Sequence, residues 1–114
     1  MADLTIHRGS HQIGGCCTEI TCGGERILID FGANLPGADS GAQTKDREMV
    51  QKVFGTRQDG TVLFTHYHSD HYGLFKKVPK GVPMYIGPLA KDILRILVPY
   101  IDRDEREKGI SIVE

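Results

Sequence analysis

The sequence predicts an α/β fold with a mixed sheet, in which helices pack against the strands. The N-terminal third alternates polar and apolar residues, as half-buried strands do, and helix-like segments separate the later strands. Two uninterrupted apolar runs, residues 27–29 and 62–64, are typical of strands buried on both faces. From Pro88 onward the apolar residues recur at helical spacing, which indicates an amphipathic helix.

The first three strands are expected in the N-terminal third of the chain. Residues 4–6 and residues 17–22 alternate in polarity and predict two short strands. Gly23 and Gly24 are typical of a hairpin turn, so a third strand over residues 26–31 should pair with the second. That strand ends in aspartate, phenylalanine and glycine.

Helices and strands alternate in the remainder of the sequence. A helix over residues 45–54 is expected, with Thr44 as its N-cap, an apolar face that includes Met49 and Val53, and Gly55 as its stop. Pro99 should end or kink the last helix. The other expected elements are a strand over 61–65, a helix over 70–77, a strand over 82–86, a helix from Pro88 and a further strand over 110–113.

Composition indicates a soluble globular domain and does not select a partner. Hydrophobic residues make up 39% and charged residues 25%, and the formal net charge of -1 neither favours nor excludes nucleic acid. No segment resembles a signal peptide or a membrane span, so we expect a cytoplasmic protein that does not contact membranes. The three cysteines, Cys16, Cys17 and Cys22, are odd in number, which favours free thiols.

A cluster of metal-ligand side chains follows the 61–65 strand directly. His66 and His68 are two residues apart, so in an extended chain both imidazoles can reach one ion. Asp70 and His71 come where the chain turns into a helix, and they can face a second ion nearby. One such histidine alone would more often be a surface or core residue, and Asp70 alone could be a helix N-cap. Three histidines and an aspartate within six residues predict a metal site.

The pattern His-X-His-X-Asp-His over residues 66–71 resembles the signature of the metallo-β-lactamase fold superfamily. Thr65 before it, Gly73 after it and the earlier strand that ends at Asp30 and Gly32 fit the same pattern. The resemblance implies that residues 1–114 form a single partial domain, the N-terminal half of an αββα sandwich. It also implies two metal sites, with Zn²⁺ as the first choice and Mn²⁺ or iron as further ions that accept these ligands.

The resemblance implies a role for each residue of the cluster. His66 and His68 would bind the first zinc ion, and Asp70 and His71 would bind the second. Asp70 would also orient the attacking water, and so act in catalysis. Asp30 would either hydrogen-bond to the metal-ligating side chains or accept backbone N–H bonds at the end of its strand. The sequence does not favour one of these two interpretations over the other.

The polar, glycine-containing loop over residues 8–15 should lie at the same edge of the sheet as the cluster. His11 in that loop could then contact substrate phosphate or the metal-bound water. The alternative is that His11 is an ordinary polar loop histidine.

Within the superfamily, residues 9–20, 29–32 and 82–88 look most like the RNA-processing branch, which includes ribonuclease J and the β-CASP-like cleavage-and-polyadenylation endonucleases. This resemblance implies the N-terminal part of a zinc-dependent nuclease that hydrolyses RNA through a metal-bound hydroxide. Glycine-rich first loops are also found in glyoxalase II and in lactonases. A hydrolase of small-molecule esters, thioesters or lactones is therefore the alternative.

The sequence departs from the family because the later metal ligands are missing. The family takes two more histidines and a bridging aspartate from later strands, whereas no histidine follows His71. Asp92, Asp102 and Asp104 do not fall at expected strand ends. A half sandwich also leaves an apolar sheet face for a missing C-terminal half or a second copy to cover. We therefore expect the 114-residue chain alone to be inactive, and an inactive metal- or partner-binding module is the third hypothesis.

Overall fold

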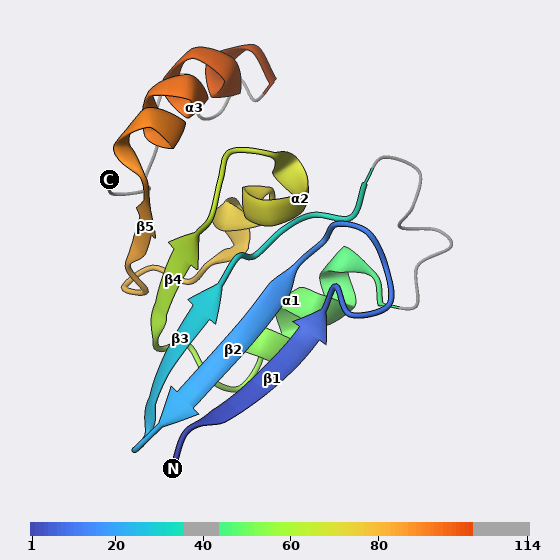
Figure 1. The fold of residues 1–114 in the computed structure, drawn as a ribbon, viewed down its shortest axis with the longest axis vertical. Coiled ribbons are helices and arrows are strands. Elements are labelled where there is room, and N and C mark those ends of the chain that lie inside the picture. Colours follow the sequence, from blue (N-terminus) through green and yellow to red (C-terminus); the bar gives the residue numbers. More distant parts are fainter. Residues whose placement is uncertain (36–43, 102–114) are drawn as a thin grey trace.

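The fold is a mixed five-stranded sheet whose strands neighbour one another in chain order. The computed structural model describes residues 1–35 and 44–101. The strands are β1 (Asp3–Arg8), β2 (Cys17–Cys22), β3 (Glu25–Ile29), β4 (Thr61–Phe64) and β5 (Met84–Ile86) (Figure 1). The first three strands pair antiparallel, whereas β3–β4 and β4–β5 pair parallel. The predicted mixed α/β fold is thereby confirmed, as is the turn at Gly23 and Gly24.

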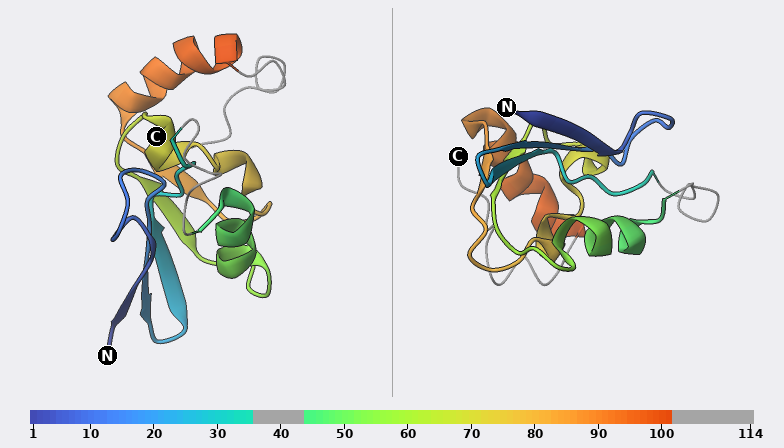
Figure 2. Two further views of the ribbon diagram at one scale, coloured as in Figure 1. Left: turned by 90° about the vertical axis from the view of Figure 1, so that its right-hand side faces the viewer. Right: turned by 90° about the horizontal axis from the view of Figure 1, so that it is seen from below.

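Helices form the connections between the parallel strands. The helix α1 (Asp46–Phe54) joins β3 to β4, α2 (Ser69–Tyr72) and the 3-10 turn η1 (Phe75–Lys77) join β4 to β5, and α3 (Pro88–Ile101) follows β5. Right-handed crossovers place successive connections on the same face of a sheet, and Figure 2 shows α1 on one side of the strands only. None of the helices in the described ranges is long and apolar enough to span a membrane.

The core lies between α1 and the sheet face that α1 covers. Met49, Val53 and Phe54 are the buried residues of α1, as its predicted apolar face requires. They join Leu28 of β3 and Val62 of β4 in one apolar cluster. The hydrophobic effect therefore anchors α1 directly beneath the two strands that lead to the histidine cluster.

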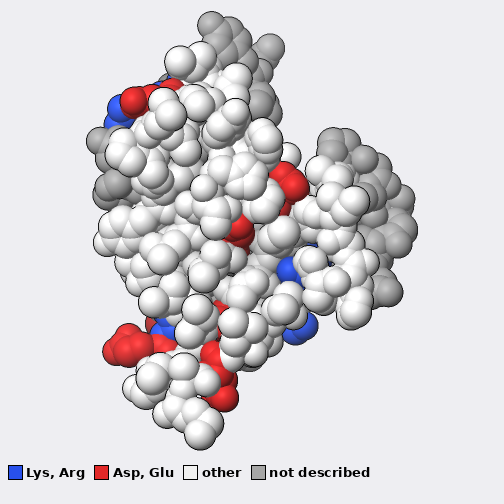
Figure 3. All heavy atoms as spheres, viewed as in Figure 1, with Lys and Arg blue, Asp and Glu red and all other residues white. Residues whose placement is uncertain are grey.

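None of the helices in residues 1–35 and 44–101 covers the other face of the sheet. The register aligns Ile6, Thr18, Ile29, Leu63 and Tyr85 in one row across all five strands. Residues in register point to the same face, and Ile6, Leu63 and Tyr85 are 49%, 39% and 41% exposed. We call this side the open face; its exposed apolar residues are Leu4, Ile6, Ile27, Leu63 and Tyr85. Figure 3 views the open face and shows few charged side chains on it.

The prediction that residues 27–29 and 62–64 are buried on both faces is therefore wrong. Along β3 and β4, Leu28 and Val62 are fully buried, whereas Ile27 and Leu63 are exposed. The described helices pack on one face of the sheet, so the side chains of an uninterrupted apolar run still alternate between the core and the surface.

Two predicted boundaries move because of local hydrogen bonding and backbone geometry. The third strand stops at Ile29, two residues earlier than expected, because Asp30 adopts a left-handed φ of 64°. The N-cap of α1 is Lys45 rather than Thr44. The Thr44 carbonyl accepts hydrogen bonds from the Arg8 and Asn34 side chains, and the Lys45 N–H bonds to the Glu48 carboxylate.

The helix predicted over residues 70–77 is divided into α2 and η1. The Leu74 N–H donates to the Phe31 carbonyl across the fold, so it does not continue the helix. The last helix extends to Ile101, so Pro99 does not end it. The expected strand over 110–113, together with Asp102 and Asp104, lies outside the described residues.

Candidate metal centre

The histidine cluster lies at the carboxyl end of β4. That strand ends at Phe64, and residues 65–68 lead from it into α2, whose first turn carries Asp70 and His71. Figure 1 shows α2 beyond the ends of β3 and β4. A strand end followed by a short helix therefore brings side chains of both segments together, as the motif predicted.

Three side chains of the cluster converge. His66, Asp70 and His71 each offer one ligand atom, and these atoms lie within 4.8 Å of one another. The His66 and His71 rings have their centroids 3.8 Å apart. Zinc–ligand bonds of about 2.0–2.2 Å place the ligand atoms of a tetrahedral site about 3.4 Å apart. Small side-chain rotations would therefore let these three groups share one ion.

His68 stands beside this group. Its ring meets the His66 ring edge-on, with centroids 4.9 Å apart, and the residue is exposed. The two imidazoles thus approach each other, as their spacing predicted. Their assignment to one ion, with Asp70 and His71 on another, stays a prediction.

Asp30 sets the orientation of His71. Its Oδ2 lies 2.7 Å from His71 Nδ1. An ionised carboxylate only accepts hydrogen bonds, so His71 Nδ1 is the donor, and in the neutral imidazole Nε2 then keeps its lone pair. The Nε2 atom lies 3.5 Å from Asp70 Oδ2. The free lone pair of His71 is therefore the one that faces the other ligands.

Thr65 in turn fixes Asp30. Its backbone N–H donates to Asp30 Oδ1 and its hydroxyl donates to Oδ2, each at 2.7 Å. Asp30 is 4% exposed and has a left-handed φ of 64°, a conformation that costs about 1–2 kcal/mol for a residue with a side chain. The sequence suggested two alternative contacts for Asp30, with a backbone N–H or with a ligand of the cluster. The Asp30 carboxylate makes both, with the Thr65 N–H and with His71.

Two glycines let the chain pack against Asp70. A Cβ atom on Gly32 would overlap the Asp70 carbonyl oxygen, and one on Gly14 would lie 2.8 Å from Asp70 Cβ. The Cys16 N–H donates to that carbonyl, and the Phe31 N–H donates to the carbonyl of His71. The loop over residues 8–15 therefore does reach the cluster, at Gly14. Sequence reasoning had assigned no role in packing to either glycine.

Arg8, which the sequence analysis did not single out, ties these segments together. Its guanidinium is buried and donates to the carbonyls of Gly15, Gly32 and Thr44 and to the Asp46 carboxylate. These bonds join the glycine loop, the end of β3 and the start of α1. This role of Arg8 could not be predicted from the sequence, because its partners are mostly backbone carbonyls, which every residue has.

His11 is not one of the three converging side chains. It is exposed and lines a separate cavity of about 210 Å³ together with His7, Gln12 and Thr44. Its predicted contact with substrate stays a prediction.

The electrostatics of the cluster favour the metal-binding form of His66. Burial lowers the pKa of His66, and the neighbouring His71 and His68 lower it further. A neutral imidazole is the form that binds metal ions. The chemistry of the donors, two imidazoles and a carboxylate, therefore fits a divalent ion such as zinc.

Comparison with curated proteins finds a partial relative. No protein-family model matches the chain. The transcription termination factor FttA of Methanosarcina mazei is 35% identical over 109 residues, which cover 91% of this chain and 16% of that protein. The chain thus spans about a sixth of the length of the curated relative that it matches.

Two of the solved structures compared with this chain share its fold. A protein of unknown function from Enterococcus faecalis aligns with a TM-score of 0.63 and 24% identity, over 87% of this chain and 28% of that one. A diphosphatase of the PhnP family aligns with a TM-score of 0.58 and 18% identity, over 100% of this chain and 49% of that one. The metallo-β-lactamase FIM-1 from Pseudomonas aeruginosa, in its mono-zinc form, aligns with a TM-score of 0.44 and 15% identity, over 99% and 44%.

Proposed function

Since the chain carries the N-terminal part of a metallo-β-lactamase fold, we propose that it supplies metal ligands to a metal-dependent hydrolase. The observation that carries this proposal is the convergence of His66, Asp70 and His71 within 4.8 Å. The bond from Asp30 to His71 supports it, because metal-ligating histidines commonly donate their other N–H to a carboxylate. We propose zinc as the ion, and manganese or iron accepts the same ligands.

Each residue of the site has a distinct task in this proposal. His66, Asp70 and His71 hold the ion, and His68 joins them or binds a second ion beside His66. A bound ion supplies an acidified water and an electrophile for the substrate oxygen. Asp30 keeps the proton of His71 on Nδ1, and Asp70 orients the attacking water through its carboxylate.

We propose RNA phosphodiesters as the substrate of the complete site. The curated relative is named as a transcription termination factor, and the end of transcription involves a nascent RNA chain. The resemblance of residues 9–20 and 82–88 to the RNA-processing branch supports the same substrate class. The ligands that the family takes from later strands would come from the rest of a longer protein.

We also propose that a second sheet packs on the open face. Ile6, Leu63 and Tyr85 form part of one row of side chains across the sheet, and apolar rows of this kind are the inner faces of sheet-on-sheet sandwiches. Exposed apolar area normally drives association. The second sheet would come from the rest of a longer protein or from another copy of this chain.

The function is tested on purified chain by metal content per chain, solution mass and cleavage of a labelled RNA oligonucleotide. We expect bound zinc, with cleavage appearing only in an assembly that completes the ligand set. A chromogenic ester serves as the alternative substrate, and its hydrolysis without RNA cleavage would contradict the nuclease proposal. A sample that binds metal but turns over neither substrate in any assembly would indicate a binding module.

A further inference from the structure

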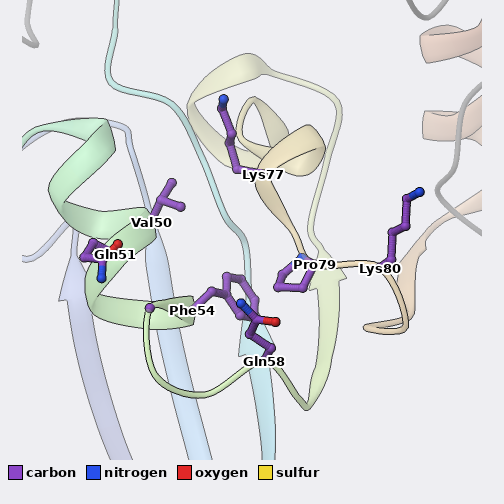
Figure 4. Close-up of a pocket in the computed structure, with 8 residues that line it drawn as sticks. Val50, Gln51, Phe54, Gln58, Lys77, Pro79 and Lys80 are labelled. Carbon is purple, nitrogen blue, oxygen red and sulfur yellow. The ribbon is translucent and has the colours of Figure 1, made fainter.

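A second candidate site lies on the helix-covered side of the sheet, apart from the metal ligands. It is a cavity of about 430 Å³, within the range of about 300–1,000 Å³ that is typical of ligand sites. Its walls come from α1 and the segment after it, and from η1 and the segment that leads to β5 (Figure 4). The lining residues are Val50, Gln51, Phe54, Gly55, Gln58, Lys77, Pro79 and Lys80.

The charges at this cavity all have one sign. Lys77 and Lys80 are exposed, and no acidic residue is among the eight that line the cavity. Within the described part of the chain, neither amine lies within ion-pair distance of a carboxylate. Two lysines without acidic partners attract an anionic ligand, even though the net charge of the chain is -1.

The remaining walls offer hydrogen bonds and apolar contact. Gln51 and Gln58 are exposed, and each amide offers both donors and an acceptor. Val50 and Pro79 are half-buried, and Phe54 is 3% exposed, so it closes the cavity without offering a free ring face. Figure 4 shows Phe54, Gln58 and Pro79 pointing toward one another, with Lys77 and Lys80 extending from separate points of the chain.

We propose that this cavity binds a ribose-phosphate segment of single-stranded RNA. The proposal rests on RNA being the substrate of the metal site. Lys77 and Lys80 offer two cationic contacts at this cavity, and phosphate contacts of this kind position a nucleic acid on a protein. Gln51 and Gln58 would bond to base edges or ribose hydroxyls, and Val50 and Pro79 would pack against the nucleoside between the phosphates.

The test is the binding of a fluorescently labelled, single-stranded oligoribonucleotide to the whole chain in the presence of EDTA, so that neither metal nor cleavage contributes. The double variant Lys77→Ala/Lys80→Ala should bind at least tenfold more weakly. It should also lower the slope of log affinity against log salt by about 1.4, since each phosphate contact to a single strand contributes about 0.7. The variant Gln51→Glu/Gln58→Glu, which adds two carboxylates without changing size, should lose affinity similarly.

The matched control is Arg47→Ala/Lys52→Ala, which removes two positive charges from exposed positions of α1 outside the cavity. It should change the affinity less than threefold. Equal losses in both double variants would mean general attraction and would overturn the proposal, as would unchanged binding by the lysine variant. Displacement of RNA by inorganic phosphate alone would also overturn it, because the site would then recognise a single anion.

Experiments can contradict the nuclease proposal and the RNA-binding proposal independently of each other. RNA bound through Lys77 and Lys80 without metal-dependent cleavage in any assembly would leave this cavity supported and contradict the nuclease proposal. The opposite result is metal-dependent cleavage of RNA, with neither RNA binding nor turnover changed by Lys77→Ala/Lys80→Ala. That result would support the nuclease proposal and contradict RNA binding at this cavity.

Discussion

Asp30 and His71, 41 residues apart in the sequence, meet at 2.7 Å between Oδ2 and Nδ1. This contact joins the end of β3 to the first turn of α2. It leaves His71 Nε2 as the atom that faces Asp70, at 3.5 Å. The orientation of one candidate ligand is therefore determined by a carboxylate that lies outside the ligand motif.

Replacing Asp30 with asparagine should weaken zinc binding. The amide keeps the shape of the side chain but removes the charge that holds the proton on His71 Nδ1. Loss of such a partner typically costs about 10–100-fold in metal affinity. Competition with a chromogenic chelator measures the affinity, and the ¹⁵N shifts of the His71 ring report the tautomer. Asp92→Asn, at an exposed position of α3, is the control; equal affinities in the two variants would contradict the role of Asp30.

Gly32→Ala should destabilise the fold around Asp70. Its Cβ atom would overlap the Asp70 backbone, and overpacking of this kind costs about 1–3 kcal/mol or more. Gly87→Ala is the matched control, since nothing lies within 4 Å of its added Cβ. The control should leave the free energy of unfolding unchanged or raise it by about 0.4–1 kcal/mol, because alanine reduces the conformational entropy of the unfolded chain. Urea unfolding followed by circular dichroism measures both, and similar midpoints would refute the packing argument.

Charge on the open face should reduce association without unfolding the chain. We expect the 114-residue chain to form oligomers, and Ile27→Lys/Leu63→Lys to shift its solution mass toward the 12.6 kDa of one chain. Both side chains are exposed, so the core stays intact. Val62→Lys, on the buried face, should unfold the protein instead. Sedimentation equilibrium provides the masses, and a wild-type chain that is monomeric at every concentration would contradict self-association.

The thiol of Cys17 should make stability fall at alkaline pH. Burial raises the pKa of Cys17 from 9.0 to about 12, and the neighbouring Glu19 contributes to the rise. The stabilisation is complete below the unfolded value and is lost as the pH rises from 9 to about 12, because the unfolded chain releases the proton first. The slope is at most about 1.4 kcal/mol per pH unit.

Cys17→Ala should remove this part of the pH dependence, measured as the difference in unfolding free energy between variant and wild type across the same range. Cys22→Ser, at an exposed position, should keep it. Identical slopes in wild type and Cys17→Ala would show that the thiol does not titrate as described.

Local patterns in the sequence were sufficient to predict most of the fold. The glycine pair at Gly23 and Gly24, the apolar spacing of α1 and the histidine motif after β4 each depend on residues that are close in the chain. The alternation of burial along β3 and β4 was missed, because it depends on which sheet face carries helices. An apolar run alone does not contain that information.

The support of the candidate site was harder to predict, because it depends on contacts between distant segments. Arg8 bonds mainly to carbonyl oxygens, which every residue possesses. Gly32 is needed only because Asp70 lies against it. The sequence suggested two interpretations of Asp30, but its left-handed backbone and its bond to His71 come from the folded arrangement.

The most direct test of the central claim is a calorimetric zinc titration of the metal-free chain beside the His66→Ala/His71→Ala variant. We predict saturable binding of one or two ions by the wild type, loss of that binding in the double variant, and retention of binding in His11→Ala. Equal zinc binding by the wild type and the double variant would contradict the assignment of His66, Asp70 and His71 as a metal centre.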